Sequence, residues 1–156
     1  MSRPGGERSA GAGAGARTLA AETLCEGEGV GDILWLDEPL SFWGGTDLRT
    51  GAITDVHHPQ HGVSLTNRVL VMSASRGSSS SSSVLAEQIR AEVAPAAILL
   101  SSRDAIVTLG ALAASEVYTT RLPILLLGAD ELANLPRSVS VTVHATESAA
   151  SVTWRH

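Results

Sequence analysis

The chain has 156 residues, of which 44% are hydrophobic and 17% are charged. Its formal net charge of −5 argues against a nucleic-acid binder, because such proteins usually have a basic surface. No apolar run approaches the roughly 18 residues of a transmembrane helix. A single cysteine, Cys25, excludes an intrachain disulfide, a multi-cysteine zinc site and an iron–sulfur cluster held by this chain alone.

The N-terminal segment, residues 1–17, is rich in Gly, Ala and Ser and has no hydrophobic period, which predicts a flexible tail. No apolar stretch follows its arginines, so it does not look like a secretory signal, and we expect a soluble cytoplasmic protein. The next apolar residues predict two short strands separated by a glycine-rich turn over residues 27–31. Residues 37–66 are punctuated by Gly and Pro and predict a long packed loop.

From residue 69 onward, strand and helix signals alternate. Strands are predicted at 69–72, 95–100, 123–127 and 139–143, and helical segments at 84–90, 104–118 and 130–135. In the longest helix we expect Asp104 to be the N-cap and an apolar face to be formed by Ile106, Leu109, Ala113 and Val117. The pattern predicts an α/β domain over residues 18–145, with a β-rich N-terminal half and strand–helix alternation in the C-terminal half. Residues 146–156 have no clear partner and are expected to be a C-terminal tail.

Six consecutive serines, residues 78–83, are the most unusual local feature. A serine run is often a low-complexity linker, but this one lies between a buried strand and an amphipathic helix, directly after Arg76 and Gly77. Gly77 permits a tight turn, and the serines then occupy a helix N-terminus, where unpaired backbone N–H groups attract carboxylates and phosphates. An anion site and a capped surface helix both remain open from the pattern.

Other candidate groups have simpler interpretations. Three histidines, His57, His58 and His61, lie close together, but their spacing matches no regular metal site, so a structural histidine within the loop is favoured and no metal site is predicted. The acidic residues of the same loop, such as Asp47 and Asp55, are expected to stabilise turns. Cys25 is expected to be a small buried hydrophobe.

Taken together, the motifs resemble the small subunit, or swivel domain, of the aconitase X family. The resemblance is carried by PLSFWGG at 39–45, His58-Pro59, RGSSS at 76–80, Val84-Leu85, PAAI at 95–98 and Leu109-Gly110, in this order and spacing. It implies a swivelling β/β/α fold. The usual family turn reads Gly-Arg-Gly-Ser, so this sequence departs from it at Ser75, and again at Ser81, where relatives often have Gly.

The resemblance also implies that this chain is one part of a dehydratase. A large subunit would hold the iron–sulfur cluster and most of the site for a small carboxylate substrate, and the small subunit would close over it. The chain is too short to include that larger part, so we expect a separate subunit of a heteromer. No nucleic acid or membrane partner is expected. An apolar surface around Phe42 and Trp43 would be covered by the large subunit.

For the site itself, the resemblance implies that Ser78 is the catalytic base, acting as an alkoxide. A helix N-terminus and backbone donors would stabilise that charge. Arg76, Gly77, Ser79 and Ser80 are the expected substrate-binding residues, with Arg76 either in the cleft or in solvent, and no metal ligand is expected in this chain.

Two substrates are implied by the family, cis-3-hydroxy-L-proline and (R)-5-phosphomevalonate. All eleven basic residues are Arg, and the Ala- and Gly-rich composition favours a GC-rich bacterial source and hence the hydroxyproline enzyme. Two alternatives from another class are a non-catalytic regulatory subunit and a free-standing anion-binding module.

Overall fold

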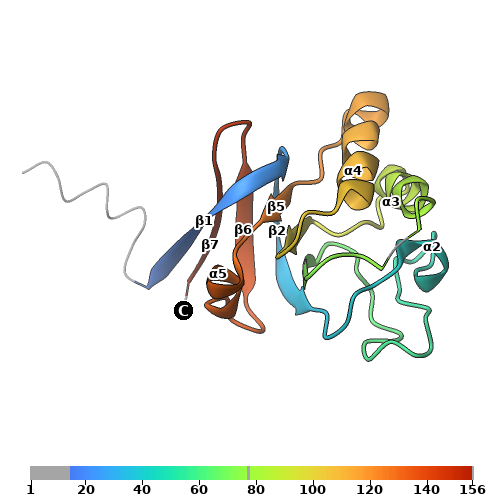
Figure 1. Ribbon diagram of the computed structural model, residues 1–156, viewed down its shortest axis with the longest axis horizontal. Coiled ribbons are helices and arrows are strands. Elements are labelled where there is room, and N and C mark those ends of the chain that lie inside the picture. Colours follow the sequence, from blue (N-terminus) through green and yellow to red (C-terminus); the bar gives the residue numbers. More distant parts are fainter. Residues whose placement is uncertain (1–14, 77, 156) are drawn as a thin grey trace, which may run out of the picture.

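Seven strands close into a barrel in the order β1-β5-β4-β3-β2-β6-β7, and two helices pack against one side of it (Figure 1). The computed structural model describes residues 15–76 and 78–155. The elements are β1 (Ala16–Cys25), β2 (Gly27–Trp35), α2 (Phe42–Gly45), β3 (Val69–Met72), α3 (Ser81–Arg90), β4 (Ala97–Leu100), α4 (Ala105–Tyr118), β5 (Ile124–Leu126), α5 (Ala129–Ala133), β6 (Ser140–Ala145) and β7 (Ala150–Arg155). The predicted α/β class and the order of strands and helices from residue 69 to 145 are confirmed.

The middle of the barrel wall is parallel. Strand β3 pairs in parallel with β2 and with β4, and β4 pairs in parallel with β5. The remaining pairs, β1 with β5 and β7, and β6 with β2 and β7, are antiparallel. Parallel neighbours need crossovers. The crossover from β3 to β4 contains α3 and that from β4 to β5 contains α4, while residues 36–68, which include α2, connect β2 to β3. The carboxyl ends of four strands therefore meet at one edge of the barrel.

Side chains of the parallel strands alternate between two cores. Val69, Val71 and Leu99 point into the barrel, where α5 adds Leu132. The intervening residues point outward against α3 and α4 and form the second core with Leu85, Ile89 and Val107; on the strands these are Leu70, Met72, Ile98, Leu100 and Ile124. Both faces of these strands are thus covered, which explains their uninterrupted apolar sequences. Burial of each such side chain contributes about 1.5–3 kcal/mol.

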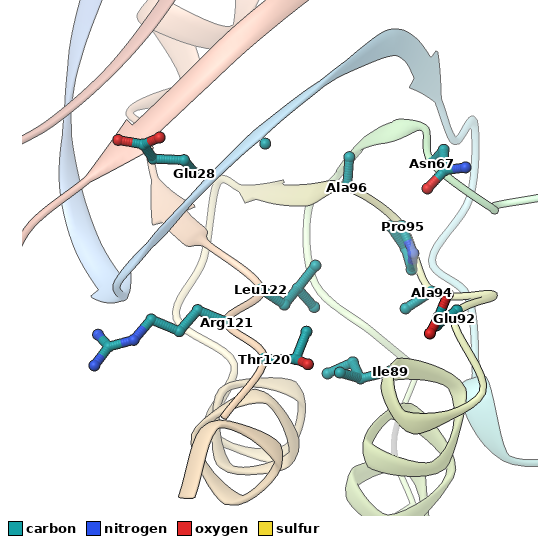
Figure 2. Close-up of a pocket in the computed structure, with 11 residues that line it drawn as sticks. Glu28, Asn67, Ile89, Glu92, Ala94, Pro95, Ala96, Thr120, Arg121 and Leu122 are labelled. Carbon is teal, nitrogen blue, oxygen red and sulfur yellow. The ribbon is translucent and has the colours of Figure 1, made fainter. Parts of the chain in front are cut away.

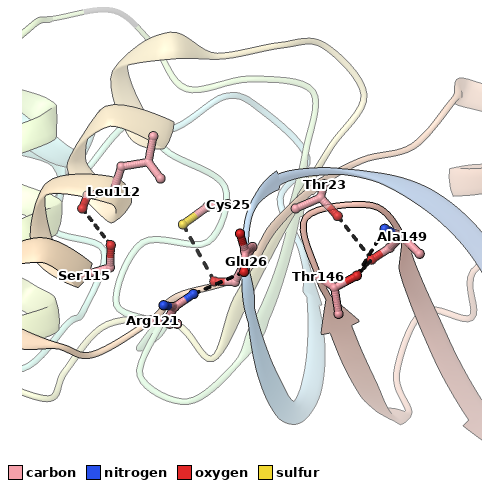
Figure 3. A network of polar contacts seen from close by, with 8 residues as sticks. All are labelled: Thr23, Cys25, Glu26, Leu112, Ser115, Arg121, Thr146 and Ala149. Atoms are coloured by element: carbon pink, nitrogen blue, oxygen red, sulfur yellow. Dashed lines mark hydrogen bonds and ion pairs between the residues drawn. The ribbon is translucent and has the colours of Figure 1, made fainter.

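The predicted glycine-rich turn over 27–31 is wrong, because these residues are strand. The chain reverses at Glu26, whose carboxylate pairs with Arg121 at 3.2 Å (Figure 3). Gly29 and Gly31 lie inside β2, where a Cβ would come within 2.2 Å of the carbonyl oxygens of Ala96 and Asn67. The glycines therefore permit close approach of neighbouring backbones rather than a turn.

Both predicted tails also need correction. Residues 16 and 17 begin β1, and residues 150–155 form β7, which pairs with β1 along its first half and with β6. The C-terminal strand buries Val152 and Trp154 in the barrel interior. Its partner β1 lies more than a hundred residues away in sequence, so local patterns do not reveal the pairing. Residues 1–14 of the predicted tail lie outside the described residues.

The face of α4 that packs inward is also different from the predicted one. Gly110, Ala111 and Ala114 are buried against α3, whereas Leu109 and Val117 are 60% and 68% exposed. The helix is apolar on all sides, so its periodicity does not distinguish a buried face, and the small residues allow the closest helix contact. Among the described residues, no helix combines the length and hydropathy required to cross a membrane.

Candidate functional site

The loops that follow β2, β3 and β4 meet at the carboxyl edge of the parallel strands. The loop after β3 is joined to the loop after β4 by the Ser102 N–H, which donates to the Ser73 carbonyl at 3.0 Å. It is joined to the loop after β2 by the Arg76 N–H, which donates to the Leu40 carbonyl at 2.8 Å. In open parallel sheets this edge is where ligands bind.

Ser78 lies in the β3–α3 loop and is half-buried. Its Oγ accepts a hydrogen bond from the Ser80 N–H at 3.2 Å, and its carbonyl accepts one from the Ser81 N–H at 2.9 Å. The side chain thus lies just ahead of the first turn of α3, and a backbone donor already points at its oxygen. Such a donor, together with the positive end of the helix dipole, stabilises negative charge on that oxygen.

The remaining predicted site residues surround this turn. Arg76 is 56% exposed and its guanidinium lies 3.7 Å from the Glu38 carboxylate. Ser79 and Ser80 are exposed, and Ser80 precedes α3 without a side-chain capping bond. Gly77 lies outside the described residues. Arg76, Ser78, Ser79 and Ser80 therefore share one loop, while their contacts with a substrate remain a prediction.

Asp104 makes a contact at this edge that the sequence pattern does not reveal. It caps α4 as predicted, because its Oδ1 accepts from the N–H groups of Ile106 and Val107 at 3.0 and 3.2 Å. Its Oδ2 reaches back to the β3–α3 loop and accepts from the Ser75 N–H at 2.6 Å and the Ser75 hydroxyl at 2.5 Å. Only the cap could be predicted from local sequence.

Ser81 and Trp43 form a second contact that the sequence did not reveal. The Ser81 side chain is completely buried, and its Oγ accepts from the Trp43 N–H at 3.1 Å. The hydroxyls of Ser75 and Ser81 therefore both take part in hydrogen bonds, to Asp104 and to the Trp43 N–H. The predicted apolar surface around Phe42 and Trp43 is half wrong, because Phe42 is fully buried and only Trp43, at 57%, is exposed.

His58 braces this region as a structural histidine, as expected. Its Nδ1 accepts from the Gln60 N–H at 3.0 Å, so its Nε2 carries the proton and donates to the Glu38 carbonyl at 3.0 Å. Glu38 is also the partner of Arg76, so the loop containing His58 supports the position of that arginine. In the described part of the chain, no group of three metal-ligating side chains comes together.

Asp47 has the turn-stabilising role that was expected of it. Its Oδ1 accepts from the N–H groups of Arg49 at 2.7 Å and Thr50 at 3.0 Å. These bonds stabilise the ionised carboxylate and lower the pKa of Asp47 below its ordinary value. Cys25 is 3% exposed, and this burial raises the pKa of its thiol, as suits a small buried hydrophobe.

A cavity of about 350 Å³ lies at the opposite, amino edge of the parallel strands (Figure 2). Asn67, Pro95 and Leu122 line it just ahead of β3, β4 and β5, and Ile89 lines it at the end of α3. Its charged side chains, Glu28, Glu92 and Arg121, lie around its rim in Figure 2. This cavity is remote from Ser78, so the catalytic chemistry predicted for the serine does not involve it.

Comparison with known proteins finds dehydratases that share sequence with most of this chain. The chain is 45% identical over 123 residues to cis-3-hydroxy-L-proline dehydratase of Pseudomonas aeruginosa, a match that covers 78% of this chain but only 21% of that protein. It is 37% identical over 124 residues to the phosphomevalonate dehydratase small subunit of Methanothermobacter thermautotrophicus, covering 80% of this chain and 91% of that subunit. The chain therefore spans about a fifth of the first relative and nearly all of the second.

A solved structure gives the same result. One chain of Thermococcus kodakaraensis aconitase X superimposes with a TM-score of 0.75 at 26% identity, covering 87% of this chain and 98% of that one. The family model for the aconitase X swivel domain matches residues 18–152, which extends past the predicted boundary at 145 into β7. The chain therefore belongs to the aconitase X swivel-domain family.

Proposed function

We propose that this chain is the small subunit of an aconitase-X-type hydro-lyase that dehydrates cis-3-hydroxy-L-proline, and that Ser78 is its base. The observation that carries the proposal is the Ser78 hydroxyl at the carboxyl edge of the parallel strands, accepting the Ser80 N–H at 3.2 Å next to the N-terminus of α3. The 45% identity to the Pseudomonas hydroxyproline dehydratase supports the substrate.

The chemistry required of Ser78 is removal of a proton from the carbon beside the substrate carboxylate while a hydroxyl group departs. A serine hydroxyl ionises far above neutral pH, so the alkoxide needs stabilisation, which the Ser80 N–H and the α3 dipole supply. Arg76 and the exposed hydroxyls of Ser79 and Ser80 lie in the same loop and are the proposed partners of the substrate carboxylate. Arg76 would exchange its exposed contact with Glu38 for the substrate.

The residues of this chain do not fit an iron–sulfur cluster. Cys25 is buried, and the described residues contain no group of three metal-ligating side chains. The cluster implied by the aconitase X resemblance therefore belongs, in this proposal, to a large subunit. That partner would also complete the pocket, because Ser78 lies on an open edge.

A second substrate, (R)-5-phosphomevalonate, is supported by a different observation. The match to the phosphomevalonate dehydratase small subunit of Methanothermobacter covers 91% of that protein at 37% identity. A phosphate group needs basic partners. At this edge Arg76 is paired with Glu38 and Arg103 with Glu22, both in exposed pairs that a phosphate can displace.

The test is Ser78→Ala in the complex with the aconitase-X-like large subunit of the same genome, prepared without oxygen. We expect kcat on cis-3-hydroxy-L-proline to fall by roughly 10²–10⁴-fold, the usual contribution of a positioned base, with the complex intact on size exclusion. Ser83→Ala, an exposed serine of the same run, is the matched control and should keep normal turnover. Full activity of Ser78→Ala would refute the assignment of the base and favour a non-catalytic role.

A further inference from the structure

The loop that carries Ser78 is held at its beginning by a buried carboxylate from a different crossover. Asp104 is 9% exposed and follows β4, the strand next to β3. Its Oδ2 accepts both the N–H and the hydroxyl of Ser75, at 2.6 and 2.5 Å. Hydrogen bonds to an ionised acceptor at such distances are among the stronger ones in proteins.

The Asp104 carboxylate is itself immobilised. Its Oδ1 accepts the N–H groups of Ile106 and Val107 in the first turn of α4, so four donors hold the two oxygens. Because α4 packs along α3 through Gly110, the position of Asp104 is tied to the helical layer. Ser75 is thereby fixed relative to the helix that follows Ser78.

The far end of the same loop is fixed independently. The buried Ser81 Oγ accepts the Trp43 N–H, and the Trp43 carbonyl accepts the Ser41 hydroxyl at 2.7 Å. Ser75 and Ser81, which lie on either side of Ser78, are therefore both held by residues distant in sequence. Between these two points, the Ser78 side chain has the Ser80 N–H as its own donor.

We propose that Asp104 is a positioning residue for Ser78: by holding Ser75 it sets where the Ser78 hydroxyl stands when the substrate is bound. This inference rests on the proposed function. A base must meet its proton within hydrogen-bond reach, and displacement by about 1 Å can cost on the order of 10²-fold in rate. Anchoring the loop in advance removes the need to order it at the moment of reaction.

The sharpest variant is Asp104→Asn. Asparagine is as good an N-cap as aspartate, so α4 should still form. The amide has only one acceptor oxygen, however, so its NH2 group must face either the Ser75 N–H or the α4 donors. One anchor is thus lost while the shape of the side chain is retained. Ser75→Ala is the second variant, and removes only the hydroxyl contact with Asp104.

Two readouts separate positioning from general destabilisation. In the complex, Asp104→Asn should lower kcat by about 10- to 100-fold with KM changed less than about twofold, and Ser75→Ala should lower kcat by a smaller factor. An effect of charge alone would have the opposite sign, because removing a nearby negative charge favours the alkoxide. In the full-length isolated chain, amide exchange at Ser75, Arg76 and Ser78 should become faster.

Asp47→Asn is the matched control. Asp47 also accepts two backbone N–H groups, but its carbonyl lies against Gln88, about two turns along α3 from Ser81. This variant should leave kcat and the exchange of the Ser78 loop unchanged. The proposal is overturned if Asp104→Asn retains normal kcat, or if it lowers kcat while exchange in the loop stays as in the parent chain.

Failure of this proposal is distinguishable from failure of the proposed function. If Ser78→Ala retains activity, the base has been assigned wrongly, whatever Asp104 does. If Ser78→Ala is inactive and Asp104→Asn has a normal kcat, the assignment of Ser78 as the base is supported and the positioning role of Asp104 is refuted.

Discussion

The six serines of residues 78–83 have different roles despite their identical chemistry. Ser78 presents an Oγ that accepts a backbone N–H, Ser81 is buried against Trp43, and the Ser82 hydroxyl donates to the Ser79 carbonyl at 2.9 Å. Ser83 is exposed. A run that resembles a linker in composition is therefore divided by the fold into an open part and a structural part. The serines differ in how deeply the fold buries them, and the composition of the run does not predict that burial.

Ser81 provides a stability test at this scale. Ser81→Ala leaves the Trp43 N–H without its acceptor, and an unsatisfied donor next to a buried position costs about 1–3 kcal/mol. Alanine is a good helix residue, so α3 itself should not be weakened. Urea denaturation of the isolated chain should show this loss, whereas Ser83→Ala should stay within about 0.5 kcal/mol. Equal stability of the two variants would mean that the Trp43 contact contributes nothing.

One of the two roles of Asp104 could be predicted from the neighbouring sequence, and the other could not. Its capping role follows from its place ahead of an apolar helix and is confirmed. Its contact with Ser75 joins positions 29 residues apart and depends on the pairing of β3 with β4. Patterns of neighbouring residues therefore do not predict it. The same holds for Ser81 and Trp43, which are 38 residues apart.

Among the elements, the contact between α3 and α4 positions the serine loop. Gly110 lies where a Cβ would come within 2.6 Å of the Ser82 carbonyl oxygen, so the two helices meet at a glycine. In an exposed helix, Gly→Ala would stabilise by about 1 kcal/mol. Here we expect Gly110→Ala to lower stability instead, because the added Cβ would meet the Ser82 backbone, which cannot move aside as a side chain can.

Gly110→Ala should therefore destabilise the chain by about 1–3 kcal/mol, the usual cost of overpacking, and lower its Tm. Leu109→Ala, at an exposed position of the same helix, should change stability little. Thermal unfolding of both variants checks this. An increase in Tm for Gly110→Ala would show that α3 and α4 can separate without cost, and would remove the basis for a rigid helical layer behind Ser78.

The strands and helices between residues 69 and 145 were predictable because their patterns are local. Buried parallel strands such as Val69–Met72 are continuous apolar runs, and Asp104 and the apolar residues after it mark α4. The turn predicted over residues 27–31 is wrong because the glycines of β2 allow close approach of the backbone at Ala96 and Asn67. That role depends on tertiary structure and cannot be recognised from local sequence.

For the whole molecule, closure of the barrel depends on the two ends of the described chain. Ala16 pairs with Arg155 and Ala21 with Ala150, so the first and last strands complete the wall. Periodicity does not reveal this long-range pairing, and for that reason the local pattern of residues 150–155 does not identify them as a closing strand. The motifs PLSFWGG and RGSSS were sufficient to indicate the family from the sequence, whereas the closing strand β7 is evident only in the structure.

The closed barrel keeps its helical layer on one side and presents the Ser78 loop at one edge, beside the exposed side chain of Trp43 (57%). Arg76, Ser79 and Ser80, which lie in the same loop as Ser78, are exposed at this edge. A base on an open edge needs a second body to exclude water and complete the substrate site. In the proposed function the molecule is therefore one part of a catalytic assembly.

The most direct measurement is turnover by this chain co-purified, without oxygen, with the aconitase-X-like large subunit of the same genome. The complex is assayed on cis-3-hydroxy-L-proline and, in parallel, on (R)-5-phosphomevalonate. The proposed function predicts turnover of cis-3-hydroxy-L-proline that neither subunit shows alone. A complex with its cluster intact that turns over neither substrate, or only the phosphorylated one, would contradict it.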